Sequence, residues 1–184
     1  VRMVVYESLK RVALPVFNEK VLCGLGRGVA ERGRLDPAAS DLALHTLQRY
    51  AALAVAMGVG AVEAVATAAI RDSADGADFV ARVQDACGIT VRVLSGNEEG
   101  YYSALGVAAA IPGASGVVGD LGGGSLELVG LDDGNLGAST TLPLGPLHFD
   151  GGLPAPDQVD DILARTTGLG SHKGSTLYCV GGVW

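Results

Sequence analysis

The chain has 184 residues, which is enough for one large domain or two small ones. Its 13 basic and 20 acidic residues give a net charge of −7, and this acidic balance argues against a nucleic-acid-binding groove. No apolar stretch reaches about 18 residues, which argues against a membrane span. The three cysteines are widely spaced and form no C-x-x-C motif, so we expect reduced thiols in a cytoplasmic protein without a signal peptide.

The first half of the chain predicts alternating strands and helices. The first helix begins at Asp36 and Pro37, a favourable N-cap and N1 pair, and continues to Gly58. Apolar residues from Phe79 recur at helical spacing until Gly88 and indicate a second helix. Apolar and β-branched runs predict the strands, which are Met3–Tyr6, Val16–Leu22 and Val62–Ile70.

The second half continues this alternation. The β-branched run Ile89–Leu94 predicts a strand, and Ser95 with Glu98 forms a capping box that begins a helix ending before Pro112. The remaining predicted elements are a hairpin around Asp120–Glu127, a helix near Asp157–Arg165 and a strand over Thr176–Val180. This order argues for α/β layers, with a domain boundary in the segment 111–116, which is rich in Pro, Gly and Ser.

The most informative stretch of the chain is GDLGGGSLE at residues 119–127. Its predicted loop consists of Gly122, Gly123, Gly124 and Ser125. Consecutive glycines allow backbone N–H groups to converge on an anion, and Asp120 lies at the end of the preceding strand. Alternation after the loop places Ser125 and Glu127 on one face, so the motif predicts a site for phosphate and a metal ion. The alternative is a plain glycine-rich turn with a solvated acid.

Two further residues are candidates on their position alone. Glu98 belongs to the capping box, whereas Glu99 is either a partner of the helix dipole, which the local pattern favours, or a catalytic base. Arg71 follows the third predicted strand, and strand ends in α/β folds collect binding residues. The alternative for Arg71 is an ion pair with Asp72 or Asp75.

Four motifs, in this order and spacing, resemble the exopolyphosphatase / guanosine pentaphosphate phosphatase family. They are Ala66–Arg71, Ser95–Glu99, Asp120–Glu127 and Val180–Trp184. The resemblance implies an actin-like, ribonuclease-H-type α/β fold of two domains, here 1–113 and 114–184, with the active site between them. It also implies hydrolysis of the terminal phosphate of polyphosphate or guanosine pentaphosphate with Mg²⁺, and it is compatible with a homodimer.

The resemblance assigns roles residue by residue. Glu99 is similar to the family's catalytic base, which reverses the local preference. The loop Gly122–Ser125 resembles the second phosphate-binding loop of the family. Asp120 and Glu127 resemble the acids that organise metal and water, and Arg71 resembles a phosphate ligand. Charge neutralisation and the positioning of a water are the needs of phosphoryl transfer, so these roles are chemically consistent.

The chain also departs from the family pattern. The first phosphate loop of the family, Asp-x-Gly-Ser-Asn-Ser, is expected just before Val1, and both ends of the chain look cut. Gly100 stands where the family usually has alanine. We therefore expect this chain to hydrolyse polyphosphate poorly or not at all. Two alternatives stay open, an actin-like ATPase or sugar kinase and a non-catalytic phosphate- or nucleotide-binding module.

Overall fold

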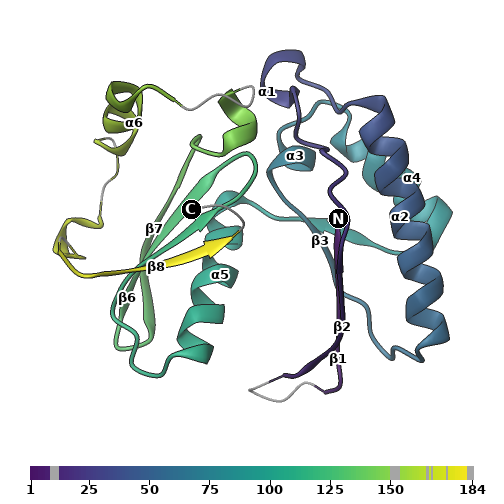
Figure 1. Cartoon of the computed structure of the whole chain (residues 1–184), viewed down its shortest axis with the longest axis horizontal. Helices are drawn as coiled ribbons and strands as arrows, with labels where there is room; N and C mark the ends of the chain where they lie inside the picture. The colour runs from purple at the N-terminus through teal and green to yellow at the C-terminus, as the bar shows by residue number, and fades with distance from the viewer. Residues whose placement is uncertain (9–12, 150–153, 165, 167, 173, 182–184) are drawn as a thin grey trace. The chain divides into compact units, whose positions relative to one another are not determined.

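The structure is a computed structural model, and it describes residues 1–8, 13–149, 154–164, 166, 168–172 and 174–181. The chain divides into two compact units, Val1–Val93 and Leu94–Trp184 (Figure 1). The division lies ahead of the expected boundary between residues 113 and 114. The reason is that the helix α5 (Gly96–Ala110) packs against the sheet of the second unit.

The first unit contains two pairs of strands and a layer of helices. An antiparallel pair is formed by β1 (Arg2–Tyr6) and β2 (Pro15–Lys20), and a parallel pair by β3 (Ala64–Ala66) and β4 (Val91–Val93). The helices are α1 (Val29–Arg32), α2 (Pro37–Ala56), α3 (Ala68–Arg71) and α4 (Gly76–Cys87). The two longer helices, α2 and α4, pack side by side (Figure 1).

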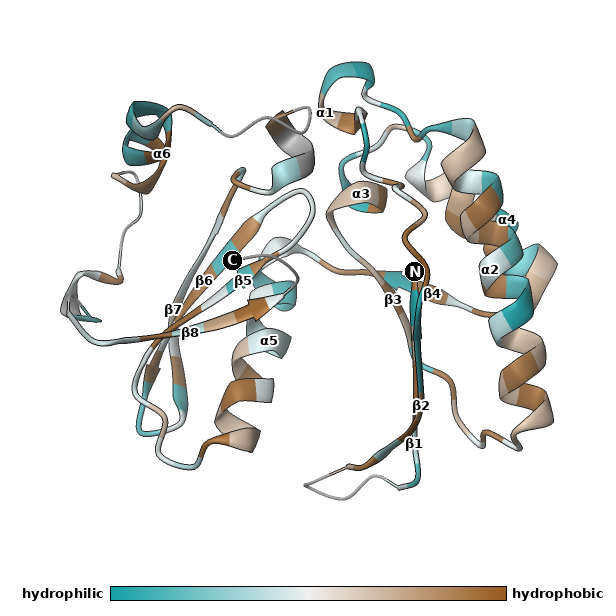
Figure 2. Ribbon diagram, in the orientation of Figure 1, coloured by the Kyte–Doolittle hydropathy of each residue, from teal (hydrophilic) through white to brown (hydrophobic). Residues whose placement is uncertain are grey.

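Local signals place both long helices of this unit where the sequence predicts them. The side chain of Asp36 accepts a hydrogen bond of 2.9 Å from the backbone N–H of Ala39, which caps α2. Gly88 ends α4 in the left-handed conformation, with φ of 67°. Hydrophobic and hydrophilic residues alternate along both helices (Figure 2), and the two helices contribute to a buried cluster that includes Ala43, Phe79 and Val83. No described helix is long and apolar enough to cross a bilayer.

The predicted strand Val62–Ile70 is wrong in its second half. Only Ala64–Ala66 form a strand, and Ala68–Arg71 form the short helix α3. The backbone N–H groups of Ile70 and Arg71 both donate to the carbonyl of Thr67, which closes this helical turn. A short apolar run that is rich in alanine is compatible with a strand or a helix, so periodicity alone does not separate the two.

The second unit is a four-stranded sheet with helices. Its strands are β5 (Gly116–Leu121), β6 (Leu126–Asp132), β7 (Asn135–Leu142) and β8 (Thr176–Gly181), in the spatial order β7-β6-β5-β8. The pair β5–β8 is parallel, and the other two pairs are antiparallel. Besides α5, the unit contains α6 (Pro156–Leu163) and two 3₁₀ helices, η1 (Pro146–Phe149) and η2 (Gly170–His172).

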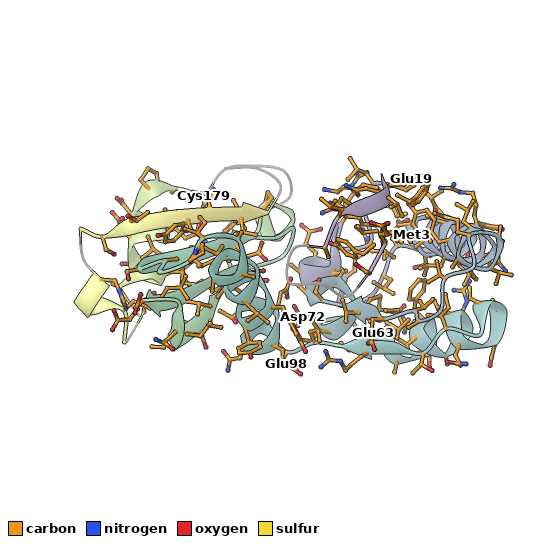
Figure 3. All side chains as sticks on the ribbon, turned by 90° about the horizontal axis from the view of Figure 1, so that it is seen from below. Met3, Glu19, Glu63, Asp72, Glu98 and Cys179 are labelled. Carbon is orange, nitrogen blue, oxygen red and sulfur yellow. The ribbon has the colours of Figure 1, made fainter. Side chains whose placement is uncertain are left out.

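Helix α5 covers the sheet of the second unit, with contacts to β5, β6 and β7. Ala104 of the helix and Val118, Val129 and Leu131 of the sheet form its buried core. The three cysteines of the chain are free; Cys179 lies on β8, where Figure 3 labels it. This packing places the N-terminal turn of α5 over the strands that carry the glycine loop.

Candidate active site

The glycine loop joins β5 to β6 through a tight connection. Leu121 and Leu126 form the last pair of the β5–β6 ladder, and the backbone N–H of Gly122 donates to the carbonyl of Ser125 over 2.9 Å. Residues 122–125 therefore make the whole turn. The predicted hairpin is confirmed, with the glycines at its tip.

The backbone of this loop packs closely against Gly145, which follows β7. A Cβ atom built on Gly145 would lie 2.2 Å from the carbonyl carbon of Gly124 and 2.3 Å from the nitrogen of Ser125. Real side chains do not approach backbone atoms so closely, so only glycine fits at residue 145. Sequence reasoning missed this support, because nothing in the local pattern around Gly145 connects it to the loop.

Two acids flank the loop as partners across the strands. Asp120 on β5 lies directly opposite Glu127 on β6, and opposite residues of an antiparallel pair point to the same face of a sheet. Glu127 is only 1% exposed, so it is not the solvated acid of a plain turn. It lies beneath α5, where a Cβ atom on Gly100 would be 3.2 Å from the Cβ atom of Glu127.

The hydroxyl group of Ser125 lies at the end of the loop. Ser125 is buried, and its Oγ has no hydrogen-bond partner among the residues that the structure describes. Buried hydroxyl groups in proteins are normally hydrogen-bonded, and leaving one without a partner costs about 1–3 kcal/mol. The structure therefore leaves one polar group of the loop able to bind a ligand.

Glu99 reaches the glycine loop from the first turn of α5. Its Oε1 lies 3.8 Å from the position that a Cβ atom on Gly122 would occupy. The capping box behind it is confirmed, since the Oγ of Ser95 accepts from the Glu98 N–H at 3.2 Å and the Ser95 N–H donates to Glu98 Oε2 at 2.9 Å. Glu98, labelled in Figure 3, thus orders the helix start. The carboxylate of Glu99 lies beside the loop.

Ser103 belongs to the same group of residues, although sequence reasoning missed it. It lies one helical turn after Glu99 on α5, and its hydroxyl donates a hydrogen bond to Oδ2 of Asp120. Residues four apart share one face of a helix, so the spacing from Glu99 is the signal that could have found Ser103.

The fourth motif lies at the end of β8. Gly181 has a φ of 97°, and a Cβ atom there would lie 2.8 Å from Oδ1 of Asp120. The glycine therefore leaves room for this carboxylate. Residues 182–184 of the motif lie outside the described residues.

Arg71 lies in the first unit, whereas the other candidates lie in the second. Its side chain is 22% exposed, and its Nε contacts Oδ1 of Asp72 at 3.1 Å. The predicted alternative of an ion pair with Asp72 is therefore present. Asp75 interacts elsewhere, because it accepts from the Leu35 N–H at 3.0 Å and lies 3.5 Å from Arg34.

The donor atoms near the glycine loop suit a hard cation such as Mg²⁺. Asp120, Glu127 and Ser125 offer only oxygen atoms, and Mg²⁺ usually takes one or two carboxylates and fills its other positions with water and substrate phosphates. No group of three or more His, Cys, Asp and Glu side chains in the described parts of the chain could hold a metal alone. The residues therefore fit a Mg²⁺ ion that shares its ligands with a phosphate, but not a closed protein cage.

A family model described as the Ppx/GppA phosphatase family matches residues 4–151. Among curated proteins, the chain is similar to Exopolyphosphatase 1 of Mycobacterium tuberculosis, with 28% identity over 133 residues, and to Exopolyphosphatase 2 of that organism, with 34% identity over 137 residues. Each match covers 71% of this chain and, respectively, 39% and 43% of the relative. The chain thus spans less than half the length of these curated relatives.

A solved structure gives the same assignment at the level of the fold. The chain is similar to the Ppx/GppA family member of Aquifex aeolicus, with a TM-score of 0.71 and 28% identity, over 87% of this chain and 54% of that one. The α/β, actin-like fold predicted from the four motifs is therefore confirmed.

Proposed function

Because this chain belongs to the Ppx/GppA phosphatase family, we propose that it takes part in releasing the terminal phosphate of inorganic polyphosphate. The two curated relatives are named exopolyphosphatases, which supports polyphosphate as the substrate. Guanosine pentaphosphate also ends in a phosphoanhydride and is the competing substrate. The observation that carries the proposal is the carboxylate of Glu99 beside Gly122 of the loop.

Glu99 is the proposed general base. A carboxylate near a bound terminal phosphate accepts a proton from a water molecule as the water oxygen attacks phosphorus. The phosphoanhydride bond breaks in this step, and the shortened polyphosphate leaves with the bridging oxygen. The capping box fixes the helix turn from which Glu99 projects, so the base is held by a rigid element.

The glycine loop is the proposed phosphate-binding element. The N–H of Gly122 is used within the turn, so the loop's other backbone N–H groups and the hydroxyl of Ser125, which has no partner among the described residues, are the proposed donors to phosphate. Gly145 supports the loop from behind. We also propose Arg71 as a phosphate ligand; this rests on its motif, because its ion pair with Asp72 lies in the first unit.

Asp120 and Glu127 are the proposed metal-organising acids. Mg²⁺, when bound, neutralises part of the negative charge on the phosphate oxygens. Asp120 is the more accessible of the two acids and would hold the ion, whereas the buried Glu127 would orient the ligands around it. The antiparallel register keeps both acids on one face of the sheet.

The adjacent glutamates of α5 allow a matched test. In a protein extended at both ends to include the first phosphate loop, we expect Glu99→Gln to lower kcat for phosphate release from polyphosphate about 10²- to 10⁴-fold, the range of a lost general base, without loss of polyphosphate binding. Glu98→Gln is the control, because glutamine also serves in a capping box, and it should keep the activity.

The same assay separates the alternatives. Polyphosphate binding with no release by the protein extended at both ends would support a non-catalytic binding module. Hydrolysis of ATP, or phosphate transfer from ATP to a sugar, with no action on polyphosphate would support an ATPase or sugar kinase. Full activity of Glu99→Gln would remove Glu99 from the mechanism.

A further inference from the structure

Ser103 connects helix α5 to the strand that carries Asp120. Its hydroxyl donates to Oδ2 of Asp120, and both residues are partly buried. A serine inside a helix commonly bonds to the carbonyl four residues earlier. Here the Ser103 hydroxyl instead donates to a carboxylate on the sheet, so it links two elements of the second unit.

The other oxygen of Asp120 lies toward Gly181 at the end of β8. Oδ1 is 2.8 Å from the position that a Cβ atom on Gly181 would occupy, so a larger residue there would press on the carboxylate. Gly181 therefore leaves room for Oδ1, and the hydroxyl donor on α5 holds Oδ2.

We propose that Ser103 is a positioning residue, which holds the carboxylate of Asp120 in the orientation that binds the metal ion. This inference rests on the proposed function, in which Asp120 is a metal-organising acid. Residues that hydrogen-bond to metal-binding side chains change metal affinity or activity about 10- to 100-fold when they are removed. The hydroxyl of Ser103 has such a position.

Ser103 also links two of the three acids of the proposed mechanism, Glu99 and Asp120. Glu99 and Ser103 lie on one face of α5, one turn apart, so the helix that projects the base also orients the metal-organising acid. An alanine at residue 103 would be a better helix former, so helix stability does not explain the serine.

The test uses Mn²⁺ as a spectroscopic probe of the metal site, measured on the whole chain by electron paramagnetic resonance. Ser103→Thr and Ser103→Val have nearly the same shape and differ in the hydroxyl group. We expect Ser103→Val and Ser103→Ala to bind Mn²⁺ about 10-fold more weakly, and Ser103→Thr to bind it nearly as the unmodified chain does. Ser139→Ala, an exposed serine of β7 that contacts Asn97, is the control and should have no effect.

Equal Mn²⁺ affinity of the threonine and valine variants would overturn the proposed role of Ser103. Asp120→Asn tests the metal site separately from Ser103. Loss of Mn²⁺ binding in Asp120→Asn with unchanged binding in Ser103→Val would show that Asp120 binds the metal ion and that Ser103 does not position it. Unchanged binding in Asp120→Asn would overturn the inference together with the metal role of Asp120. Circular dichroism of each variant shows that the fold is retained, so a weaker affinity reports on the site.

Discussion

The two units of the chain hold their candidate residues in different ways. In the first unit, the described strands form two separate pairs, and apolar side chains such as Val16 and Val65 are exposed. Its candidate, Arg71, is held by an ion pair with a neighbouring side chain. In the second unit, the register of β5 and β6 sets Asp120 opposite Glu127 beneath a covering helix.

This difference teaches which positions tolerate change. Backbone pairing and close packing determine geometry independently of salt, whereas a partly exposed ion pair contributes little energy and is screened. We therefore expect the second unit to respond sharply to small steric changes. Substitutions of charged residues in the first unit should change its free energy of unfolding only slightly.

The largest expected effect tests the packing behind the glycine loop. Gly145→Ala places a methyl group about 2 Å from the loop backbone, so the loop must move. A displacement of about 1 Å in a catalytic element can cost about 100-fold in rate, and we expect a loss of this size in phosphate release. Gly137→Ala is the control, since its Cβ atom would meet the nearest backbone atom at an ordinary 3.5 Å. Equal activities of the two variants would show that the loop does not depend on Gly145.

The next effect compares the two buried cores. Leu131 and Val83 are both 0% exposed, one in each unit. Leu131→Ala should lower the free energy of unfolding of the second unit by about 2–5 kcal/mol, and Val83→Ala should lower that of the first unit by less because fewer carbon atoms are removed. Amide hydrogen exchange in urea, followed separately for each unit, measures both losses. An equal loss of protection in both units from either variant would contradict two separate cores.

A substitution on the exposed side of α5 is expected to raise the free energy of unfolding by a small amount. Gly106 is exposed and has no neighbour within 4 Å of a Cβ atom, and alanine is favoured over glycine in helices by about 0.5–1 kcal/mol. Gly106→Ala should therefore raise the free energy of unfolding by about this amount with unchanged phosphate release. Thermal unfolding measures the gain, and a decrease would show that residue 106 contacts another part of the protein.

The smallest expected effect is the loss of stability on removing the charge of Asp75 in the first unit. The hydrogen bond from the Leu35 N–H, together with the Arg34 guanidinium, lowers the pKa of Asp75 below its ordinary value. A lowered pKa in the folded state stabilises the protein above the ordinary carboxyl pKa of 3.8, and this contribution is lost as pH falls through the lowered value. Asp75→Asn should thus reduce stability slightly at pH 7 but not at about pH 2. Urea midpoints at both pH values test this, and an equal deficit at both would exclude the ionised carboxyl as its cause.

Signals within a few residues of each other predicted much of the fold. The cap at Asp36 and the capping box of Ser95 with Glu98 are confirmed, because the partners of such bonds lie within one helical turn. The glycine hairpin is confirmed for the same reason. The start of α3 was not predicted, since a short apolar run fits a strand or a helix equally well.

The packing around the site could not be predicted from local patterns. Ser103, Gly145 and Gly181 act on residues far from them in the chain. Their roles follow from how α5, β7 and β8 meet the glycine loop and Asp120. Motifs identified the chemical groups of the site, whereas its supporting contacts required the three-dimensional structure.

The parallel pairing of β5 with β8 has a consequence for the order of folding. The hairpins β5–β6 and β6–β7 join neighbouring segments, whereas β8 pairs with β5 only after α6 and the two 3₁₀ helices have been passed. Pairings between distant segments form slowly, because the entropy of closing a long loop is lost first. We therefore expect Asp120 to meet Glu127 early in folding and Gly181 late. The surroundings of this carboxylate are complete only when the last strand has docked.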